Sequence, residues 1–100
     1  MNEAIREVLG EAGAPPLPEP LAGSIVDSHT HLDTVQDVVG IEPAISLAAA
    51  REVGVTRIAQ IGCDVAGSEF AEELARTHKN VIAAVAIHPH AAARLGREKI

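Results

Sequence analysis

The chain has 100 residues, 47% of them apolar, and a net charge of −6 at pH 7, which predicts one folded domain at most. The negative charge and the lack of a basic run argue against an electrostatic nucleic-acid platform, although a bound divalent metal would supply positive charge for a phosphate substrate. Cys63 is the only cysteine, so no disulfide can form within the chain and we expect a reducing compartment. No signal peptide or membrane-spanning stretch of roughly 20 apolar residues is found. The sequence therefore favours a soluble, cytoplasmic protein with no membrane partner and no evident obligate protein partner.

The first 23 residues are expected to form a leader. Residues 2–9 fit a short helix with apolar side chains on one side. Four prolines between residues 15 and 20 then predict an extended, polyproline-like stretch. We expect the main domain to span residues 24–100.

Three apolar stretches alternate with helical patterns in that domain. The first expected strand begins at Ile25, the second covers residues 55–61, and the third covers residues 81–87. Between the first two strands we predict a loop over Thr34–Ile41 and then a helix that begins at Pro43, because proline suits the first helical turn.

A second helix is expected between the last two strands. It is predicted to be capped by Ser68 and to pair Glu72 with Arg76 on its exposed side. A further helical segment is expected over residues 91–100. The resulting β-α-β-α-β order is typical of α/β proteins with a parallel sheet and right-handed crossovers.

The stretch Ile25–Asp33 carries most of the chemistry of the chain. Residues two apart on a strand share one face, so Asp27, His29 and His31 are expected to line up there. Two imidazoles at this spacing can both reach one metal ion, although a purely structural role is the alternative. Asp27 either orients a histidine or caps the strand end, and Asp33 either lines the site or serves in a turn.

Polar residues follow the other two expected strands as well. Cys63 and Asp64 come after the second strand, and His88 and His90 come after the third. In parallel α/β sheets the chemistry gathers at the carboxyl ends of the strands. Cys63 is a candidate nucleophile, but a small buried residue is the commoner case at such a position. Asp64 either lines the site or is a turn residue.

Two motifs resemble those of a known family, the TatD metal-dependent hydrolases. Residues 26–33, Val-Asp-Ser-His-Thr-His-Leu-Asp, are similar to the family's opening Asp-Ser/Thr-His-x-His-Leu/Phe-Asp. Residues 86–90, Ala-Ile-His-Pro-His, are similar to its later Gly-Ile/Val-His-Pro-His segment, with Ala86 where many members have glycine. The resemblance covers Ser24 to about Leu95.

The resemblance implies the first three βα units of a TIM-type barrel that hydrolyses phosphodiesters, typically DNA, with a divalent metal. His29 and His31 would be metal ligands, His88 would lie near the metal and the substrate phosphate, and His90 would line the mouth of the site. The ion is left open among Mg, Mn, Zn, Co and Ni.

Length limits what these residues are expected to do alone. A complete barrel needs about 250 residues, so we expect the chain to be the amino-terminal part of a longer protein. Alone it is expected to bind metal weakly and to hydrolyse nothing. Because its sheet edge is unpaired, it is also expected to be marginally stable, prone to aggregate or oligomeric. Two other classes stay open. One is another barrel hydrolase with a His-x-His opening, such as an amidohydrolase or a histidinol-phosphatase-like phosphoesterase, and the other is a non-catalytic α/β fragment.

Overall fold

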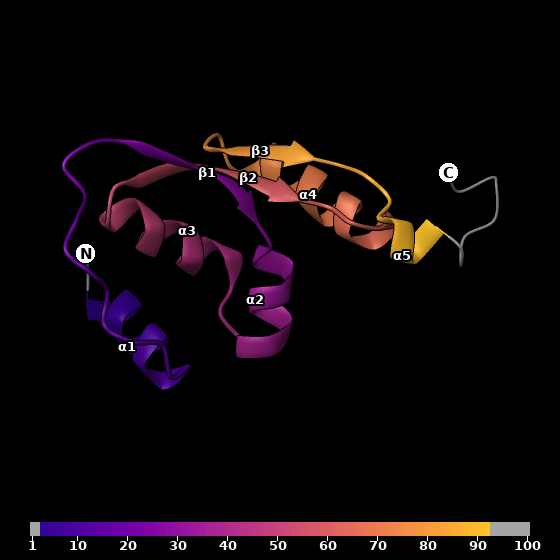
Figure 1. Ribbon diagram of the computed structural model, residues 1–100. Coiled ribbons are helices and arrows are strands. Elements are labelled where there is room, and N and C mark those ends of the chain that lie inside the picture. The colour runs from indigo at the N-terminus through magenta and orange to yellow at the C-terminus, as the bar shows by residue number, and fades with distance from the viewer. Residues whose placement is uncertain (1–2, 93–100) are drawn as a thin grey trace. The chain divides into compact units, whose positions relative to one another are not determined.

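The computed structural model describes residues 3–92, which contain helices α1 to α5 and strands β1 to β3 (Figure 1). The chain divides into two compact units. Within the described range, the first unit comprises residues 3–27 and 32–57, and the second comprises residues 28–31 and 58–92. No helix in this range is long and apolar enough to cross a membrane.

The first unit holds the helices α1 (Glu3–Glu11), α2 (Leu32–Val39) and α3 (Pro43–Glu52). Both α1 and α2 contact α3. The core of this unit consists of aliphatic side chains, because the leader, the α2–α3 connection and α3 contribute the buried residues Leu9, Ile41 and Ala49. The expected start of α3 at Pro43 is confirmed.

Helix α2 shows that the predicted loop over Thr34–Ile41 is wrong. Its sequence is rich in β-branched residues, which have modest helix propensity. Tertiary packing supplies the missing stability, since Val35 packs against the buried cluster of Leu9, Ile41 and Ala49. The helix ends before Gly40, whose φ of 81° is readily adopted only by glycine.

The leader is tied to the end of α3 by backbone hydrogen bonds. The Leu21 N–H donates to the Val53 carbonyl at 2.9 Å, and the Ile25 N–H donates to the Gly54 carbonyl at 2.9 Å. Gly54 has a φ of 98°, and a Cβ there would lie 3.0 Å from the Gly23 carbonyl oxygen. A glycine at this position therefore permits both the turn and the close approach of the leader.

The strands β1 (Ile25–Thr30), β2 (Val55–Ile61) and β3 (Val81–Ala84) form one sheet in that order (Figure 1). β2 and β3 are parallel, and their register runs from Ile58 opposite Val81 to Ile61 opposite Ala84. The bounds expected for β2 are confirmed. The predicted third strand, residues 81–87, was too long, because the ladder ends at Ala84, which pairs with Ile61, the last residue of β2.

Helix α4 (Val65–Thr77) packs on β3 in the second unit. Ala71 and Leu74 are buried on this helix, as Ile58 and Val81 are on the strands. The first turn of α4 comes very close to the end of β2. A Cβ at Gly62 would lie 2.5 Å from the Ser68 Cα, so only glycine fits there without a shift.

The predicted cap of this helix was misplaced. Asp64 is the N-cap, and its Oδ1 accepts a hydrogen bond from the Gly67 N–H at 2.7 Å. Ser68 lies inside the first turns, where its hydroxyl bonds to both backbone groups of Ala86. The pairing of Glu72 with Arg76 is confirmed.

The last described element is the short helix α5 (Pro89–Ala92). It begins two residues before the helical segment that was predicted for residues 91–100. Most of that predicted segment, residues 93–100, lies outside the described residues.

Candidate metal centre

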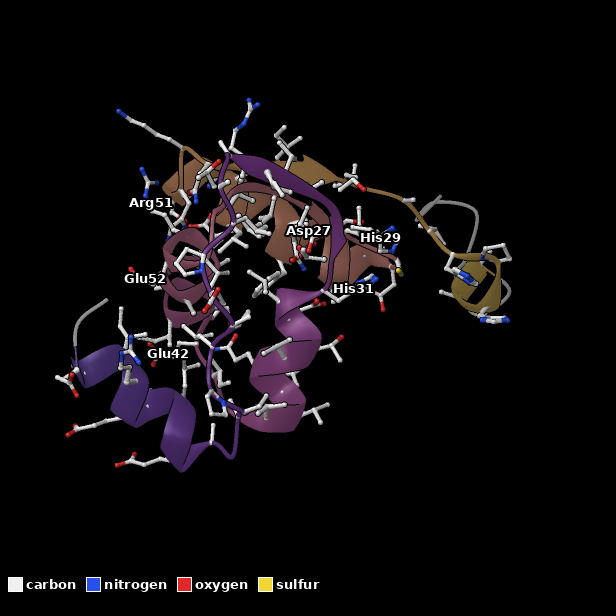
Figure 2. All side chains as sticks on the ribbon, turned by 60° about the vertical axis from the view of Figure 1, so that its left-hand side comes forward. Asp27, His29, His31, Glu42, Arg51 and Glu52 are labelled. Atoms are coloured by element: carbon white, nitrogen blue, oxygen red, sulfur yellow. The ribbon has the colours of Figure 1, made fainter. Side chains whose placement is uncertain are left out.

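His29 and His31 lie side by side at the carboxyl end of β1 (Figure 2). Their ring centroids are 5.0 Å apart in an edge-on arrangement, and their Nε2 atoms are 3.2 Å apart. His29 is exposed and His31 is half-buried. The alternation of side chains along the strand is what turns both imidazoles to one side.

The separation of the two Nε2 atoms fits two ligands of one cation. Zinc–nitrogen bonds of about 2.0–2.1 Å at a tetrahedral angle place two ligand nitrogens about 3.3 Å apart. Without a metal, one Nε2–H donates to the other ring. With a metal, both rings must carry their proton on Nδ1, which a neutral imidazole does readily. The donor pair therefore fits a divalent metal that accepts imidazole ligands.

The residue between the two histidines is anchored to the neighbouring strand. The Thr30 hydroxyl lies 3.1 Å from the Ala59 carbonyl oxygen and 3.2 Å from Gln60 Oε1. Gln60 is fully buried, with an exposed fraction of 0%. The sequence analysis missed this link, although Gln60 lies two residues after the buried Ile58 and so shares its strand face, which was a usable signal.

His88 and His90 follow β3, and their ring centroids are 4.5 Å apart. The His90 backbone N–H donates to His88 Nδ1 at 3.1 Å, so a neutral His88 carries its proton on Nε2. The Nε2 atom of this ring is then a hydrogen-bond donor. The His88 backbone is itself held, because its N–H donates to the Cys63 carbonyl.

The predicted site residues at the strand ends differ in position and in the contacts that they make. Parallel strands bring their carboxyl ends to one edge of the sheet, so both histidine pairs lie at that edge, as does the half-buried Cys63. Asp64 at the end of β2 is engaged as the cap of α4. Asp27 is an exposed residue of β1, and Asp33 lies in the first turn of α2. Among residues 3–92, no three or more His, Cys, Asp or Glu side chains form a group that could hold a metal ion.

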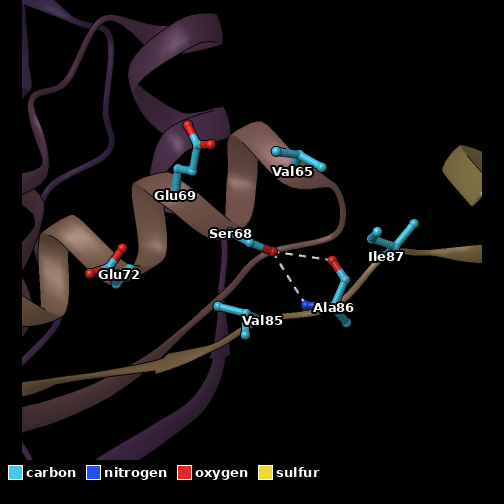
Figure 3. Close-up of a pocket in the computed structure, with 7 residues that line it drawn as sticks. All are labelled: Val65, Ser68, Glu69, Glu72, Val85, Ala86 and Ile87. Atoms are coloured by element: carbon cyan, nitrogen blue, oxygen red, sulfur yellow. Dashed lines mark hydrogen bonds between the residues drawn. The ribbon is translucent and has the colours of Figure 1, made fainter. Parts of the chain in front are cut away.

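A pocket of about 600 Å³ lies beside the first turns of α4 (Figure 3). It is lined by α4 and by the segment that follows β3, and it contains none of the predicted site residues. Its residues are Val65, Ser68, Glu69, Glu72, Val85, Ala86 and Ile87. The link between Ser68 and Ala86 forms part of its wall.

Parallel βα units with histidines at the carboxyl edge of the sheet define an α/β protein built like the first part of a TIM-type barrel. The family model described as TatD related DNase matches residues 26–100, and the chain belongs to this family. No curated protein matches the chain, and neither does any solved structure. The resemblance seen in the two motifs is thus confirmed, and membership of the family indicates a hydrolase of the metal-dependent DNase type.

Proposed function

We propose that this chain is part of a metal-dependent hydrolase of phosphodiester bonds whose substrate is DNA. The observation that carries this proposal is the 3.2 Å separation of the Nε2 atoms of His29 and His31, which suits two ligands of one cation. Family membership supports the substrate class. It also favours this function over the amidohydrolase-type alternatives, which share only the His-x-His opening.

Each histidine has a distinct proposed role. His29 and His31 hold the metal through Nε2. A divalent metal, when bound, neutralises the phosphate and lowers the pKa of a bound water. His88 donates its Nε2 hydrogen to a phosphate oxygen, because its Nδ1 already accepts the hydrogen bond from the His90 N–H. His90 therefore orients His88 through its backbone and lines the mouth of the site.

The carboxylates have supporting proposed roles that rest on the sequence motif. Asp27 and Asp33 are proposed to orient the histidines by accepting hydrogen bonds from the imidazoles. Asp64 is proposed to border the site while its side chain caps α4. The metal is one of Mg, Mn, Zn, Co or Ni, and the two imidazole ligands favour the last four.

Metal binding tests the proposed ligand pair directly. Calorimetric titration of the 100-residue chain with Zn²⁺ is expected to show weak binding that His29→Ala and His31→Ala each abolish. His78→Ala is the matched control, because that imidazole contacts Thr77 and the Leu74 carbonyl at the end of α4. Equal binding by the wild type and both ligand variants would show that the pair is not the metal site.

Hydrolysis is tested with the product of the native gene. We expect it to cleave DNA with one of the five metals, and we expect a chelator or the His29→Ala and His31→Ala double substitution to abolish cleavage. The 100 residues alone are expected to cleave nothing, because two ligands do not complete a hydrolytic site. No cleavage by the native product with any of these metals would refute the proposed function.

A further inference from the structure

The link between Thr30 and Gln60 ties the carboxyl end of β1 to β2. The Thr30 hydroxyl has a single proton, which it shares between the Ala59 carbonyl and Gln60 Oε1 at 3.1 and 3.2 Å. Gln60 is a fully buried polar residue of the second unit. Within the described residues no buried side-chain nitrogen or oxygen lacks a hydrogen-bond partner, so this polar group is satisfied where it lies.

Thr30 and the two flanking histidines project from opposite faces of the sheet. The Cβ direction of Gly62 points at Ser68 of α4, so Gln60, two residues earlier, also faces the helix layer. Thr30 meets Gln60 and therefore points to that layer too. His29 and His31 flank Thr30 on the strand, so they project from the opposite face, where they are exposed or half-buried.

The end of β1 needs such an anchor. β1 is an edge strand of the described sheet, and all of its residues except Thr30 are exposed. Few buried contacts hold a strand of this kind, and its end opens easily. A rotation of the backbone at residue 30 would swing the two flanking imidazoles apart, because their Cβ directions follow that backbone.

We propose that Thr30 and Gln60 are positioning residues for the metal pair, which keep the two Nε2 atoms at the distance that one cation requires. This inference rests on the proposed function, since it assumes that His29 and His31 bind metal. It assigns a role in metal affinity to Thr30 and Gln60, which face the α4 side of the sheet. Neither residue touches the metal.

The test compares variants at position 30 in the 100-residue chain. Thr30→Val keeps the shape and removes the hydroxyl, whereas Thr30→Ser keeps the hydroxyl and serves as the control. Thr30→Val is expected to weaken Zn²⁺ binding about tenfold, the loss typical of residues that orient metal ligands. Thr30→Ser is expected to bind within about twofold of the wild type.

Two further readouts separate positioning from mere stability. The visible absorption of bound Co²⁺ at saturation reports coordination geometry, and Thr30→Val is expected to change its bands. In the metal-free protein, imidazole ¹⁵N shifts report the hydrogen bond between His29 and His31, which is expected to be lost in Thr30→Val and kept in Thr30→Ser. If Thr30→Val does not fold, Gln60→Met is measured in its place and is expected to move the same signals in the same direction.

The outcomes distinguish this inference from the proposed function. A wild-type chain that binds neither Zn²⁺ nor Co²⁺ would overturn both. A wild-type chain that binds metal, with a Thr30→Val or Gln60→Met variant of the same affinity, the same Co²⁺ bands and the same imidazole shifts, would overturn the positioning role alone.

Discussion

Gly62 is the position where adding a single methyl group should lower the free energy of unfolding most. Its Cβ would lie 2.5 Å from the Ser68 Cα and 2.7 Å from the Ser68 nitrogen, and both are backbone atoms of α4. To restore an ordinary contact of about 3.4 Å, the helix must withdraw by roughly 0.9 Å. A gap of that size forfeits a quarter to a half of the dispersion energy of each contact that opens. Ala71 and Leu74, buried on the same helix, would lose such contacts.

We therefore expect Gly62→Ala to lower the free energy of unfolding by about 3 kcal/mol, the upper end of the range for overpacking. Urea titration followed by circular dichroism measures the change. Gly10→Ala in α1 is the control, since nothing would lie within 4 Å of a Cβ at this position. It is expected to raise the free energy of unfolding by about 0.5–1 kcal/mol. Ser68→Ala is expected not to rescue Gly62→Ala, because the backbone clash remains. A Gly62→Ala variant within about 0.5 kcal/mol of wild type would refute the reasoning.

Three other predictions follow from the same structure. Asp64→Ala should lower the free energy of unfolding by about 1 kcal/mol, measured by urea titration, because the cap of α4 is lost. The Gly67 amide hydrogen should then exchange faster with solvent, and a Ser68→Ala variant with the same increase would contradict the assignment of Asp64 as the cap. The hydrogen bond with Glu72 raises the pKa of Arg76 above its ordinary value, so the effect of Arg76→Gln on stability should stay constant between about pH 7 and pH 10 and vanish only as the pH rises through that raised pKa. Zn²⁺ at about 100 times its Kd should stabilise the wild type by about 2.7 kcal/mol, a gain that EDTA reverses; the same gain in His29→Ala would exclude that ligand.

Local sequence signals predicted the elements that depend on them. Pro43 marks the start of α3, and Gly54, with its φ of 98°, closes the turn before β2. β2 is bounded by Gly54 and Gly62, which is why its limits were predicted correctly. The His-x-His spacing likewise places two imidazoles on one side of a strand without any tertiary information.

Features that depend on distant contacts were not predictable in the same way. α2 is held by the packing of Val35 onto residues from α1 and α3, which its own propensities do not reveal. Asp64 and Ser68 are both capping residue types, and the choice between them was decided by Ala86, to which the Ser68 hydroxyl bonds. The anchor of Thr30 on Gln60 joins residues 30 positions apart.

The attachment of the segment after β3 has a consequence for motion. The Ser68 hydroxyl of α4 bonds to the backbone of Ala86, and the His88 N–H donates to the Cys63 carbonyl, so isolated hydrogen bonds hold this segment in place of a strand ladder. Such bonds break one at a time, and amide hydrogens there should exchange with solvent sooner than those between β2 and β3. His88 therefore lies on a segment whose backbone should open more readily than the β2–β3 ladder that precedes it.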